Sequence, residues 1–118
     1  MANTNRTKGH DAERAVARYL RGTGLYPMAI TSRAALGHDG FAQPADVIGV
    51  PGVAIEVKNV RGLSIGSALV QAEMQGGPGK IPVVVAKPIG VGLDSVGRWF
   101  AINWLEDQVS LWPKDGPL

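Results

Sequence analysis

Apolar residues between positions 10 and 21 recur three or four places apart, a spacing that predicts an amphipathic helix. The glycines that follow end the pattern, and the apolar stripe consists of Ala12, Ala15, Val16, Tyr19 and Leu20. At about 100° per residue, Glu13 falls at the edge of this stripe, so its side chain can point toward whatever the helix packs on. The opposite face carries three arginines: Arg14, Arg18 and Arg21.

Apolar and β-branched segments after this helix predict three strands. Residues 25–34 (LYPMAITSRA) read as a strand that runs into a loop, and the segment after it is irregular. Two further strands, 46–50 and 53–58, are separated by Pro51-Gly52, a pair typical of turns. The first half of the chain therefore predicts one helix followed by three strands.

The second half predicts one more helix and two more strands. Ser64 is a suitable N-cap, GGPG at 76–79 ends the helix, and the expected buried face consists of Ile65, Ala68, Leu69 and Ala72. IPVVVAKP (81–88) reads as a buried strand, GRWFAIN (97–103) as a last strand, and WLEDQVSLW (104–112) as a short helix or an edge segment. The order α-β-β-β-α-β-β predicts an α/β fold with a mixed β-sheet of about five strands flanked by helices.

Length and composition narrow the class of protein. The 118 residues show no break in composition, so we expect one domain over 1–118, with 1–7 disordered. The absence of cysteine excludes disulfides, thiolate zinc sites and cysteine nucleophiles. No apolar run approaches the roughly 20 residues of a membrane span, and the N-terminus lacks the apolar core of a signal peptide. We therefore expect a cytoplasmic protein with no membrane contact.

The charge of the chain is mildly basic. A formal net charge of +2 and a pI near 9.2 favour nucleic acid only weakly as a partner. The basic residues between positions 8 and 61 could nevertheless form one face: Lys8, Arg14, Arg18, Arg21, Arg33, Lys58 and Arg61. The competing interpretation is a solvated surface that only keeps the protein soluble.

Two charged residues interrupt the apolar strand VAIEVKN (53–59). Strand alternation places Val53, Ile55 and Val57 on one face, and Ala54, Glu56 and Lys58 on the other. A glutamate and a lysine on an otherwise apolar strand are costly unless they pair with each other or serve a function. The pattern therefore indicates either an edge-strand ion pair or a functional site.

Whether Asp46 joins Glu56 depends on the turn between the two strands. A two-residue turn at Pro51-Gly52 would place Asp46 opposite Val57 and away from Glu56. A three-residue loop over 50–52, or one bulge, would shift the pairing by one residue and set Asp46 opposite Glu56. A shared carboxylate site therefore requires the longer loop.

If the two carboxylates meet, the residues suit phosphodiester chemistry. Two carboxylates with a backbone carbonyl and waters match the oxygen ligands that Mg²⁺ or Mn²⁺ prefers. Such an ion acidifies a water and stabilises charge on a phosphoryl oxygen. Lys58 could orient the attacking water or neutralise the developing charge, and Glu13 could close the site directly or through a metal-bound water.

Asp46 followed by Glu56-Val57-Lys58 on the next strand, with Glu13 in an N-terminal helix, resembles the PD-(D/E)xK nuclease superfamily. Further segments in the same order are similar to archaeal-type Holliday junction resolvases over residues 8–105: KGHDAER, a serine after the first strand (Ser32), DVIG, IEVKN, KIPVVVAK and GRWFAIN. The chain also resembles small phage-encoded nucleases of this superfamily, which often carry a glutamine in the helix after the lysine strand, where Gln71 lies.

The resemblance implies a restriction-endonuclease-like fold and a Mg²⁺-dependent endodeoxyribonuclease, with Mn²⁺ able to substitute. Its implied metal ligands are Asp46, Glu56 and the backbone carbonyl of Val57, with Glu13 reaching the ion directly or through water. Lys58 would be the catalytic lysine, and Gln71 would support the site. The residues expected to contact DNA are Lys8, Ser32, Arg33 and Arg61. Members of this family are homodimers that nick four-way junctions symmetrically.

The chain departs from the archaeal pattern in the long segment between Ser32 and Asp46, a departure that bears on junction selectivity more than on nuclease activity. Its loop, 34–45, carries His38 and Asp39, for which DNA contact and plain solvation are equally good interpretations. Two alternatives to a junction resolvase remain. One is a less selective nuclease of the same superfamily that acts on flaps or single-stranded DNA. The other is a DNA-binding protein without catalytic activity, in which the acidic cluster is a structural ion network.

Overall fold

The structure is a computed structural model that describes residues 4–36 and 45–114, with side chains from residue 8 onward. The chain forms a five-stranded mixed sheet in the order β1-β2-β3-β4-β5. The strands are β1 (Ile30–Thr31), β2 (Val47–Ile48), β3 (Val53–Asn59), β4 (Ile81–Lys87) and β5 (Phe100–Ile102). Only the β3–β4 pair is parallel, and the other three pairs are antiparallel. The predicted α/β class and strand number are confirmed.

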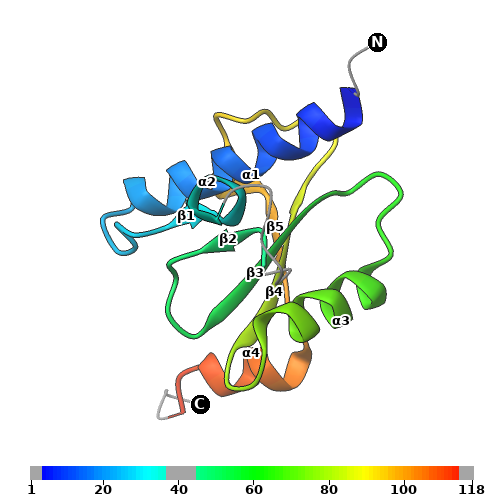
Figure 1. Cartoon of the computed structure of the whole chain (residues 1–118). Helices are drawn as coiled ribbons and strands as arrows, with labels where there is room; N and C mark the ends of the chain where they lie inside the picture. The colour runs from blue at the N-terminus through cyan, green and yellow to red at the C-terminus, as the bar shows by residue number, and fades with distance from the viewer. Residues whose placement is uncertain (1–3, 37–44, 115–118) are drawn as a thin grey trace.

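Helices cover both faces of the sheet (Figure 1). α1 (Thr4–Gly22) packs its apolar stripe on one face of β3, in a core cluster that includes Val16, Ile55 and Val57. α3 (Ile65–Gly76) covers the other face, where Leu69 packs with Val84 of β4. The central strand β3 is therefore buried from both sides.

α1 begins earlier than the sequence analysis predicts. Residues 4–7 are helical, whereas the prediction made them part of a disordered segment 1–7. Adding residues to a helix that has already nucleated costs little. Neither glycine nor proline occurs between Thr4 and Lys8 to stop it. Residues 1–3 lie outside the described part.

The hairpin between β2 and β3 has the longer of the two predicted loops. Val47 pairs with Ile55, so Gly49 is level with Val53 and residues 50–52 form a three-residue loop. Gly52 has φ +77°, the left-handed conformation that closes such loops, and the Val53 N–H donates to the Val50 carbonyl at 3.4 Å. The register that brings Asp46 opposite Glu56 is thereby confirmed.

A close contact fixes the distance between α3 and β3. A Cβ built on Gly76 would lie 2.3 Å from the Cβ of Ala54, so only glycine allows this approach. The predicted buried residues Ala68, Leu69 and Ala72 are buried, but Ile65 is 50% exposed and its prediction is wrong. Ile65 is the first residue of the helix, directly after the loop that leads from β3.

Three short elements complete the chain. α2 (Ser32–Leu36) follows β1 directly, so the loop predicted over 34–45 begins later than expected. The Thr31 hydroxyl accepts the Ala34 N–H at 3.2 Å and caps this turn of helix. The 3-10 helix η1 (Val96–Arg98) precedes β5, and α4 (Leu105–Leu111) ends the described fold as the helical alternative predicted.

His38 and Asp39 lie outside the described residues. Within those residues, no helix is long and apolar enough to cross a membrane.

Candidate active site

The carboxylate of Asp46 lies beside the central strand, just before β2 begins. Its Oδ2 accepts a hydrogen bond from the backbone N–H of Val57 at 2.8 Å. The pairing of Val47 with Ile55 places Asp46 level with Glu56, the residue before Val57. A backbone hydrogen bond to one carboxylate oxygen therefore fixes Asp46 next to Glu56.

The same hydrogen bond indicates where the Val57 carbonyl points. In a strand, the N–H and C=O of one residue point toward the same neighbouring strand. The Val57 N–H points toward Asp46, so its carbonyl points to that side as well, away from β4. The ladder between β2 and β3 has ended at Val47 and Ile55, which leaves this carbonyl beside the two carboxylates.

Glu56 is the most unusual buried residue of the fold. Its side chain is 1% exposed, and its Oε1 has no hydrogen-bond partner among the described residues. Burial, reinforced by the negative charge of Asp46, raises the pKa of Glu56 to about 8, although the Lys58 ammonium opposes the shift. Near neutral pH the buried carboxyl group therefore holds a proton.

Glu13, on α1, lies close enough to Asp46 and Lys58 for their charges to act on its carboxyl group. Partial burial and the charge of Asp46 raise its pKa, while Arg33, Arg14 and Lys58 act in the opposite direction. Its Oε2 lies 3.9 Å from the Arg33 Nε. Asp46 and Lys58 therefore act on both Glu13 and Glu56, which places the four predicted catalytic residues in one electrostatic neighbourhood although they come from three segments.

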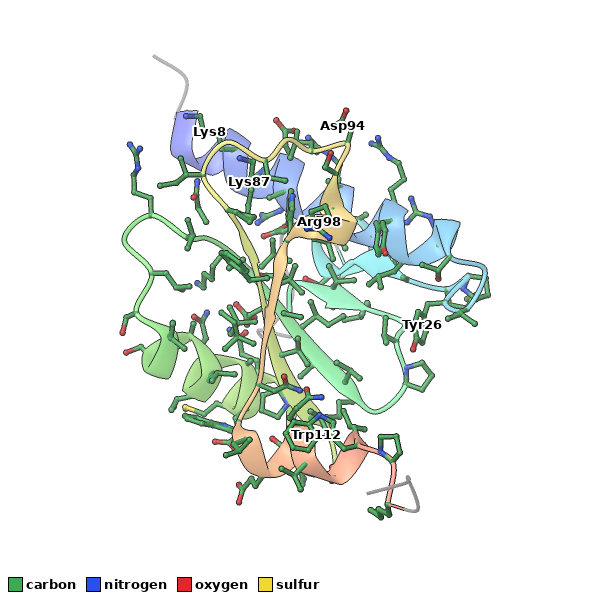
Figure 2. The ribbon with its side chains drawn as sticks, turned by 180° about the vertical axis from the view of Figure 1, so that it is seen from behind. Lys8, Tyr26, Lys87, Asp94, Arg98 and Trp112 are labelled. Atoms are coloured by element: carbon green, nitrogen blue, oxygen red, sulfur yellow. The ribbon has the colours of Figure 1, made fainter. Side chains whose placement is uncertain are left out.

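Lys58 lies between the carboxylates and a basic cavity of about 630 Å³. Two residues predicted to contact DNA, Lys8 and Arg61, line this cavity. Asn59 and Lys87 line it as well, and sequence reasoning missed both. They are neighbours because β3 and β4 are parallel and pair Asn59 with Lys87 at their carboxyl ends. Figure 2 shows Lys8 and Lys87 at the same end of the molecule.

Ser32 and Arg33, the other predicted DNA contacts, lie on the opposite side of the carboxylates. The Ser32 N–H donates to the Asp46 carbonyl at 2.9 Å, which holds the start of α2 against the site. Arg33 and Glu13 line a small cavity of about 150 Å³. Each predicted DNA-contact residue thus lines a cavity next to the carboxylates or contacts the backbone of Asp46.

Among the described residues, no hydrogen bond to the carboxylates supports the role predicted for Gln71. Gln71 lies on α3 and is partly buried. No hydrogen bond joins it to Glu56 Oε1, since that atom is unpartnered within the described part. Gln75, one turn further along α3, has a buried Oε1 that also lacks a partner there. The sequence offered no signal to prefer Gln75, because both glutamines flank the apolar stripe.

The site fits a divalent cation with few protein ligands. No group of three or more histidine, cysteine or acidic side chains that could hold a metal occurs in residues 4–36 and 45–114. Two carboxylates, one with an unpartnered buried oxygen, and a backbone carbonyl remain. Mg²⁺ typically uses one or two carboxylates and keeps several waters, so this set suits it. Glu13 would then belong to an outer layer of the site.

Comparisons with protein-family models, curated proteins and solved structures return no match to this chain. Its class is therefore the one that the fold defines, an α/β protein with a five-stranded mixed sheet. The functional argument depends on the geometry of the residues described above.

Proposed function

We propose that this protein is a Mg²⁺-dependent endodeoxyribonuclease of the PD-(D/E)xK type that acts on four-way DNA junctions as a homodimer. The observation that carries the proposal is the pairing of Asp46 with Glu56 on the central strand, with Lys58 on the same strand face. A buried glutamate next to a partly buried aspartate costs stability, and the pair is better explained by chemistry than by structure.

Asp46, Glu56 and the Val57 carbonyl would hold the ion, and Mn²⁺ could replace Mg²⁺. When bound, the ion supplies a more acidic water and charge stabilisation on the phosphoryl oxygen. The hydrogen bond from Val57 keeps Asp46 in position before any ligand arrives. Glu56 must lose its proton to bind, which its pKa near 8 makes possible close to neutral pH.

The remaining residues act on the water and on the DNA. Lys58 is close enough to the carboxylates to lower the pKa of Glu56, so its ammonium can orient the attacking water and offset charge on the phosphate. Arg33 holds Glu13 at the border of the site. The cavity with Lys8, Arg61 and Lys87 presents cations to phosphates next to the scissile bond.

The experiment compares cleavage of a four-way junction, a flap and a linear duplex of matched sequence in Mg²⁺. The wild-type protein should cut the junction fastest and at symmetric positions. Equal cutting of all three substrates would replace the resolvase assignment with a less selective nuclease. Sedimentation of the protein–junction complex reports whether two subunits bind one junction.

Two substitutions test the residues that carry the proposal. Glu56→Gln and Lys58→Ala should each lower cleavage by at least about a hundredfold. The loss of a residue that only supports a metal ligand already costs about 10–100-fold, and these two residues are proposed to act in the site itself. Junction binding should survive. Glu73→Gln, the same change at an exposed glutamate of α3, is the control and should leave cleavage unchanged. A wild-type protein that binds junctions but cuts nothing would make it a DNA-binding protein.

A further inference from the structure

A second basic groove extends along α1 beyond the candidate active site. It has a volume of about 580 Å³ and lies between the outer face of α1 and the segment 27–34 around the edge strand β1. We call it the Arg18 groove, and its charged members are Arg14, Arg18 and Arg21. No carboxylate lines it within the described residues.

The three arginines of this groove differ in how freely they can bind a ligand. Arg14 forms an ion pair with Asp11, and Arg21 donates to the Ala29 carbonyl at 2.8 Å. Arg18 is exposed and has no ion pair in the described part of the chain. Arg18 is thus the cation most available to an anionic partner.

The floor of the groove is apolar. Pro27, Met28 and Ile30 line it, and Met28 is 75% exposed. A flexible thioether can pack on the flat ring of a base, and the neighbouring guanidinium can pair with a phosphate. Bases are accessible in this way in a single strand, whereas a duplex hides their faces.

The groove is continuous with the site. The small cavity around Glu13 and the Arg18 groove share Arg14, Thr31 and Ala34. Along α1, residues between 8 and 12 line the basic cavity beside Lys58. Residues between 10 and 14 line the small cavity around Glu13, and residues between 14 and 21 line the Arg18 groove. From Lys8 to Arg21 the helix rises about 20 Å, the length of about six phosphates at B-form spacing.

We propose that the Arg18 groove binds an unpaired DNA strand next to the scissile phosphate, such as a strand opened at the centre of a junction, with Arg18 on a phosphate and Met28 against a base. The inference rests on the proposed function for the identity of the ligand. An acidic protein segment would match the charge, but it would not use the exposed apolar floor or the continuity with the carboxylates.

The test measures binding of a short labelled oligodeoxythymidylate by fluorescence anisotropy over a series of salt concentrations, in EDTA so that nothing is cut. Arg18→Gln should weaken binding and reduce the slope of log affinity against log salt by about 0.7, the value for one phosphate of a single strand. Met28→Ser should weaken binding several-fold without changing the slope. Lys80→Gln removes one charge from an exposed lysine that lines none of these cavities, and should change neither quantity.

An unchanged slope for Arg18→Gln, or no binding of the oligonucleotide by the wild-type protein, would overturn the proposal. So would a poly-glutamate peptide whose binding depends on Arg18 while DNA binding does not. The two proposals fail separately. If DNA binding depends on Arg18 but the protein cuts no DNA in Mg²⁺, the proposed nuclease activity is wrong and the proposed role of the groove stands. If the protein cuts DNA and Arg18→Gln binds DNA normally, the proposed role of the groove is wrong and the nuclease activity stands.

Discussion

The two faces of β3 are equally buried but differ in what their side chains do. Toward α1 the strand presents Ile55 and Val57, which join the main apolar core. Toward α3 it presents Ala54 and Glu56, which are also buried, and then Lys58. The α1 face stabilises the fold through apolar burial, whereas the α3 face contains a carboxyl group that costs stability and carries the proposed chemistry.

The contrast appears in adjacent residues. Ile55 and Glu56 are next to each other and nearly inaccessible to water, yet only Ile55 has the partners its chemistry requires. A fold retains an unsatisfied buried carboxyl group only if the rest of the core offsets its cost. Replacing Ile55 by alanine should therefore lower the free energy of unfolding, whereas replacing Glu56 by glutamine should raise it at pH 8–9.

The largest change in stability is expected from Ile55→Ala. Removing this side chain from the α1 face should lower the free energy of unfolding by about 2–5 kcal/mol, measured by urea denaturation. Ile65→Ala, the same change at the half-exposed start of α3, is the control and should cost far less. Similar losses for the two variants would show that the α1 face is not the main core.

The second expected effect is that the free energy of unfolding depends on pH because of Glu56 on the α3 face. The pKa of Glu56 is raised from 4.5 to about 8, so the folded protein binds more protons than the unfolded chain between these values. In metal-free buffer the free energy of unfolding should therefore fall as pH rises through this window, by up to about 1.4 kcal/mol per pH unit.

Glu56→Gln should remove most of this slope, and at pH 8–9 the variant should melt above the wild-type protein. A smaller slope of the same sign should remain, because the pKa of Glu13 is raised as well. Thermal melts across pH in EDTA provide the measurement. A wild-type stability that increases with pH through this window would contradict the buried, protonated state of Glu56.

Gly76→Ala should give the next effect, because the new methyl group would overlap Ala54 on the α3 face. We expect a loss of about 1–3 kcal/mol, the usual cost of overpacking. Gly66→Ala is the matched control on the same helix, where a Cβ meets nothing within 4 Å, and should be neutral or stabilising. Equal outcomes for the two glycines would contradict the close approach of α3 to β3.

The smallest effect is expected from Arg33→Gln at the border of the site. The pair with Glu13 is partly exposed, so its loss should change stability by less than about 1 kcal/mol. Because the Arg33 guanidinium lowers the pKa of Glu13, removing it should raise that pKa further, as carboxyl ¹³C chemical shifts would report. Arg98→Gln, at an exposed residue of η1, should leave the pKa of Glu13 unchanged.

Local patterns were enough to predict the fold class and the two faces of β3. Alternation placed Glu56 and Lys58 together, and the helical stripe placed Glu13 at the edge of α1. The register of Asp46 could only be stated as a condition, because the turn at Pro51-Gly52 admits two loop lengths that differ by one residue. The structure selects the longer loop through Gly52.

Contacts between distant segments were out of reach of the sequence. Asn59 and Lys87 become neighbours only through the parallel register of β3 and β4, which depends on the crossover through α3. The Arg18 groove needs β1 beside α1, and the arginines alone read as a solvated helix face. Ile65 was misplaced because periodicity does not show how far the buried stripe of a helix continues toward its first residue.

The central claim is that a divalent cation binds to Asp46 and Glu56 by displacing a proton from Glu56. Calorimetric titration of Mn²⁺ at pH 7, in buffers of different ionisation enthalpy, measures the protons released per ion bound. We predict a release close to one proton, which disappears in Glu56→Gln together with most of the affinity. Binding without proton release, or equal binding by Glu56→Gln, would contradict the site proposed for this protein.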